Sequence, residues 1–377
     1  MDNAVYLDHN ATTPLRDVAL KAIMDANAGG GNASSVHRFG RLAHRTLEDA
    51  RERVAALVGA KAEQVVFTSG GTEANNLALL GTLAGIANRR VLVSAVEHSS
   101  VAKIPGVETV PVDADGIIDI AALDCMLLAA DTPSVVSIML ANNETGVIEP
   151  VAEAAAIAHR HGALVHCDAV QAAGKIPLEW SALGVDLMSI SAHKIGGPQG
   201  VGALIVGDGV EIVPRTFGGG QERGRRTGTE NIPGIAGFGA AAEEAKGSLD
   251  DYRALAQLRD AIEERILKIS DKARIFAHAR DRLPNTAMIA MPGVNAEAQV
   301  MAFDLAGVAV SAGSACSSGK AAAGSVLKAM GVAEDVASNA VRVSLGWTST
   351  MADAEAFIAA WTKIYAKGQV GAEVPAA

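Results

Sequence analysis

The chain has 377 residues, which is long enough for a large core and for two domains. Its 32 lysines and arginines are outnumbered by 42 acidic residues, the formal net charge is −10 and no basic tract occurs, so a nucleic-acid partner is disfavoured. The acidic first residues lack the apolar core of a signal peptide, and no apolar run is long enough to span a bilayer. Three scattered cysteines fit a reducing compartment, and we therefore expect a cytoplasmic protein.

Apolar patterns predict helices and strands in alternation. A helical stripe over residues 47–58 ends at Gly59, and strands are expected at residues 63–69, 185–190 and 200–206. Strand-like runs alternate with helical patterns from about residue 65 to residue 206, which predicts an α/β domain with a mostly parallel sheet covered on both faces. A second helical stripe, from Leu255 to Ile269, opens the C-terminal region. Because the residues before it, 246–248, break the alternation, we place a domain boundary near residue 248.

Two chemically suggestive side chains follow predicted strands. Lys194 lies between an apolar run and a glycine-rich turn, where partial desolvation lowers an ammonium pKa and frees the amine as a nucleophile. Asp168 ends another apolar run, twenty-six residues upstream. A pyridoxal phosphate site needs such a pair, a lysine to bond the cofactor and an aspartate to keep its ring nitrogen protonated. Taken singly, Lys194 could be a surface charge and Asp168 could cap the next helix.

Two glycine-rich segments complete the pattern. Gly70-Gly71-Thr72 follows a predicted strand and opens a helix, where backbone N–H groups and the helix dipole favour a phosphate. Its spacing matches neither the triphosphate loop nor the dinucleotide fingerprint. Cys316 lies in a small, polar, glycine-rich stretch that we expect to be an exposed mobile loop, so its thiol is available as a nucleophile. Cys125 and Cys167 are instead expected to be buried.

The chain resembles the cysteine desulfurases of nitrogen fixation and iron–sulfur cluster assembly, in the class V aminotransferase group, over nearly its whole length. The matching segments occur in order at residues 6–14, 31–37, 67–76, 97–101, 142–146, 166–171, 191–198, 218–229, 314–316 and 342–346. The resemblance implies a fold-type I pyridoxal phosphate-dependent transferase. It has a large cofactor-binding domain, here residues 15–248, and a smaller α+β domain, here residues 1–14 and 249–377, which carries the cysteine loop.

The resemblance also implies the roles of the site residues. Lys194 would bond the cofactor and move protons, His98 would stack on the ring and act as acid–base, and Cys316 would take the sulfur. The remaining cofactor contacts would be Asp168 and Gln171 on the ring, Asn143 beside it, Gly71, Thr72, Ser191 and His193 on the phosphate, and Thr229 on the phosphate of the other subunit of a homodimer. Arg342, in a strand-like run, suits a substrate carboxylate, although a structural ion pair is equally open before the resemblance is considered. Asn32 and Asn143 would be further substrate contacts. No metal is implied.

The expected reaction converts L-cysteine to L-alanine and leaves a persulfide on Cys316, whose sulfur passes to an acceptor or scaffold protein for iron–sulfur assembly. Three alternatives stay open: a selenocysteine lyase or other class V enzyme, a cofactor-less sulfur-carrying scaffold, and a nucleotide-binding α/β protein. The chain departs from the common pattern at Gly196 and Gln199, which could loosen the wall of the site, and at Trp347, where a basic residue is frequent. Beyond Lys367 it shows no match to the scaffold-binding extension of the housekeeping branch.

Overall fold

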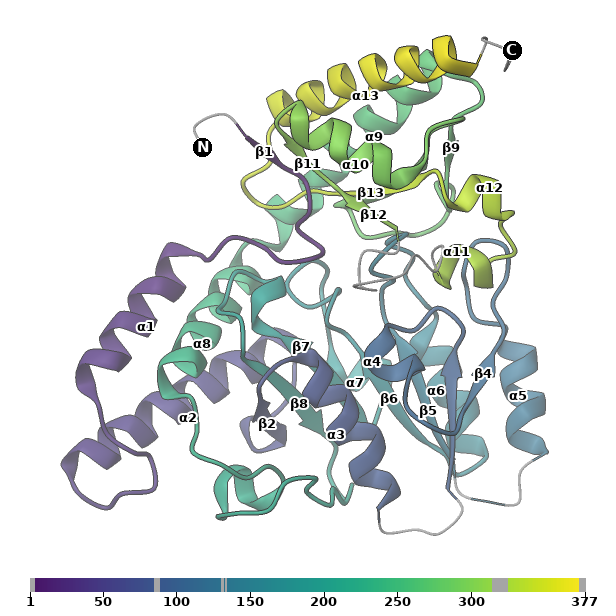
Figure 1. Cartoon of the computed structure of the whole chain (residues 1–377). Coiled ribbons are helices and arrows are strands. Elements are labelled where there is room, and N and C mark those ends of the chain that lie inside the picture. The colour runs from purple at the N-terminus through teal and green to yellow at the C-terminus, as the bar shows by residue number, and fades with distance from the viewer. Residues whose placement is uncertain (1–3, 85–88, 130–131, 133, 314–324, 373–377) are drawn as a thin grey trace.

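A computed structural model describes residues 4–84, 89–129, 132, 134–313 and 325–372. Its centre is a seven-stranded sheet (Figure 1). The strand order is β2 (Val65–Thr68), β8 (Gly202–Val206), β7 (Leu187–Ser191), β6 (Leu164–Asp168), β5 (Ser134–Met139), β3 (Arg90–Ser94) and β4 (Val107–Val110). All neighbours pair in parallel except the two pairs that β8 makes. The predicted mostly parallel α/β sheet is confirmed.

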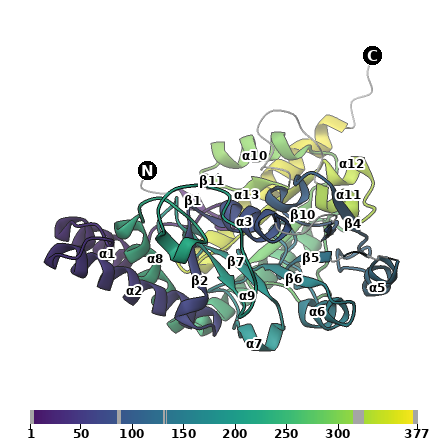
Figure 2. The ribbon, with the colours of Figure 1, turned by 90° about the horizontal axis from the view of Figure 1, so that it is seen from below.

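Helices cover both faces of this sheet because successive strand residues point to opposite sides. Leu187 packs with the residues of α3 (Gly71–Leu83), whereas its neighbour Met188 packs with the core beneath α2 (Arg38–Val58) and α6 (Val151–Arg160). Figure 2 shows α3 on one side of the sheet and α6 on the other. The other helices between residues 17 and 247 are α1 (Asp17–Gly29), α4 (Ser99–Ala102), α5 (Ile120–Leu128), α7 (Trp180–Leu183) and α8 (Ile232–Gly247).

The predicted helix that ends at Gly59 is α2. Its last residue is Val58, and Gly59 adopts the left-handed conformation (φ 69°) with its N–H bonded to the Ala55 carbonyl. Glycine reaches this conformation without strain, which makes it the usual residue after a helix. The buried residues Leu47, Ala50, Val54 and Val58 face the core, so the periodicity located the helix correctly.

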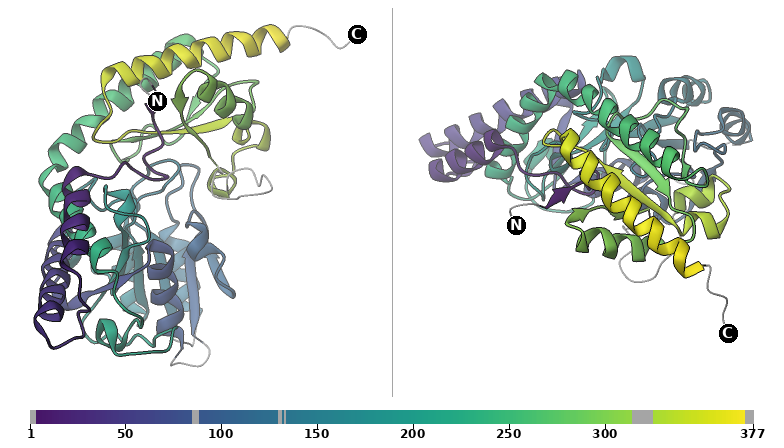
Figure 3. Two further views of the ribbon diagram at one scale, coloured as in Figure 1. Left: turned by 60° about the vertical axis from the view of Figure 1, so that its left-hand side comes forward. Right: turned by 90° about the horizontal axis from the view of Figure 1, so that it is seen from above.

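A second body is built from the C-terminal residues and the N-terminal segment. Its sheet has the order β12 (Ser311–Ala312), β13 (Ala340–Ser344), β10 (Thr286–Ala290) and β9 (Arg274–Ile275), and β1 (Val5–Tyr6) pairs in parallel with β11 (Val308–Ala309). Figure 3 shows α9 (Leu249–Ile269) and α13 (Met351–Ala372) lying along the outer side of this sheet. The shorter helices are α10 (Ala296–Leu305), α11 (Ser325–Ala329) and α12 (Glu334–Ala337). Only Ser248 separates α8 from α9.

A buried ion pair covers the free edge of β2. Arg51, on α2, bonds Glu222 through two N–H···O contacts of 2.8 and 2.9 Å, and its guanidinium also donates to the Val65 carbonyl (2.9 Å). Glu222 in turn accepts the Phe67 N–H (2.9 Å). The pair thus satisfies backbone groups of an edge strand that a neighbouring strand would otherwise satisfy. Glu222 holds a left-handed backbone (φ 45°), so the pair also anchors a strained, glycine-rich segment.

Arg51→Met is therefore expected to lower the free energy of unfolding by about 3–5 kcal/mol, because it leaves the Glu222 carboxylate buried without its cation. Urea denaturation monitored by circular dichroism measures the change. Arg53→Met is the matched control: Arg53 lies on the same helix, but its pair with Glu243 (3.2 Å) is largely exposed, so a loss of about 0–1 kcal/mol is expected. Equal losses in the two variants would contradict the edge-covering role.

Among the described residues, no helix has both the length and the apolar character needed to cross a bilayer.

Candidate active site

A cavity of about 250 Å³ opens at the carboxyl ends of β5, β6 and β7. Parallel strands that end at one edge bring residues distant in sequence together, and this edge is where α/β proteins usually bind ligands. Ten of the thirteen predicted site residues line the cavity: Gly71, Thr72, His98, Asn143, Asp168, Gln171, Ser191, His193, Lys194 and Arg342. Asn10, Ala11, Asn75, Ser100, Met139 and Val170 complete the lining.

Lys194 ends a single helical turn (Ala192–Lys194) that directly follows β7. Its Nζ donates to the backbone carbonyls of Asn10 (2.5 Å) and Ala11 (2.7 Å). The amine is half-buried, as expected for a lysine at a strand end beside glycines. The N-terminal segment thus forms the surface on which this amine rests, and Lys194 lines the cavity.

Asp168 is the last residue of β6 and is buried. One carboxylate oxygen accepts the Asn75 amide (2.7 Å), and the other accepts the Val170 N–H (3.0 Å). The alternative that Asp168 caps the next helix is wrong: the residues after it form turns, and the next helix, α7, begins after Glu179. Hydrogen bonds donated to both oxygens fix the orientation of the carboxylate at the cavity, which suits a group that pairs with a ring nitrogen.

His98 precedes α4 and caps it: Nδ1 accepts the Ser100 N–H (3.2 Å) and lies 2.8 Å from the Ser100 hydroxyl. Burial lowers the pKa of this histidine, with Asp168 acting in the opposite direction and Lys194 in the same direction. Because Nδ1 is an acceptor, the neutral ring carries its proton on Nε2. A neutral imidazole at the cavity wall can accept a proton, and the imidazolium that forms can later release it.

One end of the cavity offers donors suited to an anion. The helix α3 begins at Gly71, whose hypothetical Cβ would lie 2.8 Å from Val170 Cγ2, so the close approach of the backbone requires glycine. The Ser191 hydroxyl is buried and has no partner among the described residues. Burial lowers the pKa of His193 to about 4, helped by Lys194 and Lys175. Free helix N–H groups, a hydroxyl and a nearby lysine favour a phosphate here.

Another part of the lining offers a cation. Arg342 in β13 is 4 % exposed; it donates to Asp8 (2.6 Å) and to the Asn143 carbonyl (3.1 Å), and its Nε has no partner among the described residues. The structural ion pair, one of the two predicted alternatives, is thus present, and the carboxylate-binding role stays a prediction. Burial raises the pKa of Glu144 to about 8, although the nearby Arg342 charge acts in the opposite direction.

These groups fit pyridoxal phosphate. The Ser191 hydroxyl, which has no partner among the described residues, and Gly71 at the start of α3 suit a phosphate. The Asp168 carboxylate, which accepts two hydrogen bonds, suits a ring nitrogen. The Arg342 Nε, which also has no partner among the described residues, suits the carboxylate of an amino acid. The cavity volume lies near the lower end of the range for small-ligand sites, roughly 300 Å³.

Two predicted site residues do not line the cavity. Asn32 and Thr229 are exposed and lie elsewhere on this single chain. Cys316 falls outside the described residues. Cys167 is buried as predicted, and burial raises the pKa of its thiol well above the usual value. The prediction that Cys125 is buried is wrong: α5 buries Leu123 and Leu127, and Cys125 lies between them in sequence on the exposed face.

Sequence reasoning missed Asn10, Asn75 and Lys175. Asn10 links the lysine to the rest of the site through both its carbonyl and its amide, although only its place in the first matching segment marked it out. A lysine in the alanine-rich turn at residues 172–176 is the one signal that could have drawn attention to Lys175.

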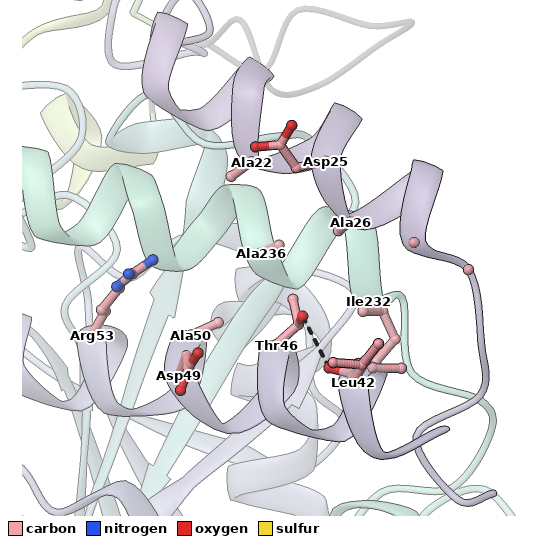
Figure 4. A pocket seen from close by; sticks show the side chains of 13 residues that line it. Ala22, Asp25, Ala26, Leu42, Thr46, Asp49, Ala50, Arg53, Ile232 and Ala236 are labelled. Atoms are coloured by element: carbon pink, nitrogen blue, oxygen red, sulfur yellow. Dashed lines mark hydrogen bonds between the residues drawn. The ribbon is translucent and has the colours of Figure 1, made fainter. Parts of the chain in front are cut away.

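A second cavity, of about 280 Å³, lies between α1, α2 and α8 (Figure 4). Its described lining consists of small and apolar side chains with Asp25, Thr46, Asp49 and Arg53, and contains no lysine, histidine or cysteine. It offers no group suited to covalent chemistry, so the cavity at the strand ends is the candidate active site.

Comparisons with known proteins agree with this geometry. The family model described as aminotransferase class-V matches residues 5–357. A cysteine desulfurase of Cereibacter sphaeroides is 45% identical over 361 residues, which cover 93% of this chain and 92% of the relative. A relative from Dictyoglomus turgidum, named cysteine desulfurase IscS, is 40% identical and covers 94% and 92%. The crystal structure of a NifS-like protein from Rickettsia africae superposes with a TM-score of 0.89 at 36% identity, covering 97% of this chain and all of that one. The chain therefore belongs to the class-V aminotransferase family and, within it, to the cysteine desulfurases.

Proposed function

We propose that this protein is a pyridoxal phosphate-dependent enzyme that takes sulfur from L-cysteine, releases L-alanine and carries the sulfur as a persulfide on Cys316. The observation that carries the proposal is the gathering of Lys194, Asp168, His98 and Arg342 around one cavity. The relatives named cysteine desulfurase support the choice of substrate.

Each cofactor contact follows from the chemistry of the cavity wall. Lys194 would hold the cofactor covalently, Asp168 its ring nitrogen and Gln171 its ring oxygen, while Gly71, Thr72, Ser191 and His193 would hold the phosphate. When bound, pyridoxal phosphate supplies an electron sink for the bonds at the Cα atom of an amino acid.

The chain's own residues would bind the substrate and move its protons. Arg342 would pair with the α-carboxylate, as its fork of N–H donors suits a planar anion, with Asn143 and Asn32 as further contacts. Lys194, once its amine is released, and His98 would transfer protons at the substrate carbon atoms. The Cys316 thiolate would then bond to the substrate sulfur as the C–S bond breaks. The bonding electrons stay with carbon, which takes up a proton and becomes the methyl group of alanine.

We further propose that the enzyme is a homodimer. Seven large apolar side chains between residues 15 and 42 are exposed on this chain: Leu15, Val18, Leu20, Met24, Val36, Phe39 and Leu42. Apolar exposure gathered in one segment is typical of a protein interface. Thr229 lies outside the cavity of its own chain, which is what a residue serving the phosphate of a partner subunit requires.

The remaining assignments follow from the same family. We propose that residues 15–248 act as the cofactor-binding domain, and that residues 1–14 and 249–377 form the small domain that carries the cysteine loop. Sulfur from Cys316 would pass to an acceptor or scaffold protein for iron–sulfur assembly, in the cytoplasm, where reducing conditions keep thiols free.

Purified protein, reconstituted with pyridoxal phosphate, is expected to be yellow and to form sulfide and alanine in equal amounts from L-cysteine in the presence of a thiol reductant. L-selenocysteine, assayed in parallel, separates the proposal from its nearest alternative. Turnover of selenocysteine without turnover of cysteine would make the protein a selenocysteine lyase. A colourless protein that does not bind added pyridoxal phosphate would indicate a sulfur-carrying scaffold and overturn the proposal.

A further inference from the structure

A second lysine lies enclosed directly behind the site. Lys175 follows β6 in the turn that also carries Gln171, and its side chain is 2 % exposed although it does not line the cavity. Fully buried lysines are rare, since an ammonium group loses its hydration there. Among the described residues, no carboxylate forms an ion pair with Lys175, so its burial needs another explanation.

The amine is satisfied by two neutral oxygens. Lys175 Nζ donates to Gln171 Oε1 (2.7 Å) and to Asn10 Oδ1 (2.7 Å). Burial lowers its pKa well below the usual value, and the charges of Lys194 and Arg342 act in the same direction. A neutral amine has two N–H donors, which matches the two amide oxygens, so Lys175 can reside here without a counter-ion.

These bonds fix which end of the Gln171 amide faces each neighbour. Gln171 Nε2 donates to the Asn10 backbone carbonyl (2.9 Å), a group that can only accept. With Oε1 held by Lys175, the second N–H of Nε2 is the polar group that Gln171 can offer the cavity. A flipped amide would present a carbonyl there, and a carbonyl repels the ring oxygen of pyridoxal phosphate.

The same lysine also supports the resting place of Lys194. Asn10 is held at its side-chain oxygen by Lys175 and by Asn285 Nδ2 (3.0 Å), while its backbone carbonyl accepts the Lys194 amine. We infer that Lys175 is a positioning residue: it keeps the Gln171 amide with its N–H toward the cofactor oxygen and steadies Asn10 beneath Lys194. The inference rests on the proposed use of pyridoxal phosphate.

The test measures cofactor affinity instead of turnover. Full-length protein stripped of cofactor is titrated with pyridoxal phosphate, and the dissociation constant is read from absorbance. Lys175→Met is expected to weaken binding about tenfold, the size expected when a polar pair is broken and one partner stays buried. In a Gln171→Met background the same change should cost less than about twofold, because its main effect acts through Gln171 and Asn285 still holds Asn10.

Asn285→Ala is the matched control. It removes the other hydrogen bond to Asn10 Oδ1 but leaves the Lys175–Gln171 bond, so the affinity should stay within about twofold of wild type. If Lys175→Met does not fold, Lys175→Gln, whose amide can still donate to Gln171, should show a loss of a few-fold at most.

If Lys175→Met lowered the affinity for pyridoxal phosphate equally in both backgrounds, the role of Lys175 would be merely structural and the inference would be wrong. Wild-type affinity in Lys175→Met would also overturn the inference. So would a tenfold loss of affinity in Lys175→Gln. Failure of the wild-type protein itself to bind pyridoxal phosphate would overturn the proposed function instead.

Discussion

Lys194→Ala protein is expected to lose turnover of L-cysteine by about 10⁴-fold or more, since the variant lacks both the covalent link to the cofactor and a positioned proton carrier. Lys175, a second amine beside the site, cannot replace it. That amine is enclosed, already donates to two amide oxygens and does not line the cavity.

Two measurements check this expectation. Sulfide and alanine formation give the rate, and borohydride reduction of the wild-type protein followed by peptide mass spectrometry should place the cofactor on the peptide that contains Lys194. Lys103→Ala is the control: Lys103 is an exposed lysine near His98, and its loss should leave both results unchanged. A Lys194→Ala protein that still turned over cysteine, with the cofactor attached elsewhere, would contradict the assignment.

The parts of the fold that the sequence predicted are those set by local pattern. Alternation of apolar runs located β7 and β8, and glycine after an apolar stripe located the end of α2. The break at residues 246–248 proved to be the junction of α8 and α9. Each of these features depends on residues within about one helix or strand length, which is the range over which periodicity is informative.

The site was predictable only where chemistry coincides with a strand end. Asp168 and Lys194 end or follow neighbouring parallel strands, so topology alone brings them together. The Asn10–Lys175 and Asp8–Arg342 bonds join residues 165 and 334 positions apart, and no local pattern encodes them. The exposure of Cys125 was missed for a related reason. Eight of the nine residues of α5 are uncharged, so the alternation of apolar and polar residues is too weak to distinguish the buried face of the helix from the exposed one.

The expectation that Gly196 loosens the wall stays a prediction, because Gly196 does not line the described cavity, but the space beside Gly196 is filled. Gly196 has a φ of 86°, and a Cβ there would meet Arg16 Cγ at 2.5 Å and Trp347 Cη2 at 2.6 Å. The Arg16 guanidinium stacks on the Trp347 ring, 4.1 Å from its centre. Two departures from the common family pattern, Gly196 and Trp347, therefore compensate each other: the missing side chain at one position is replaced by the larger one at the other.

Cys316→Ala protein is expected to lose sulfide and alanine formation by about a thousandfold or more, as is usual when a covalent nucleophile is removed. Its binding of L-cysteine should remain, because the groups proposed to hold the substrate, Arg342 and Asn143, are untouched. The absorbance of the bound cofactor, which responds to an arriving amino acid, measures that binding separately from turnover. Loss of both binding and turnover would assign Cys316 a structural role instead.

Neither of the other two cysteines is placed to take over. Cys167 is fully buried in β6, and burial raises the pKa of its thiol, which disfavours the thiolate that attacks sulfur. Cys125 is exposed but lies on α5 and does not line the cavity, so its distance from the substrate, and not its burial, makes it a poor substitute. Cys125→Ala is accordingly the matched control and should retain wild-type turnover. If Cys316→Ala stayed active while Cys125→Ala lost activity, the sulfur acceptor would have to be the exposed thiol of α5, and the proposed path of sulfur through Cys316 would be wrong.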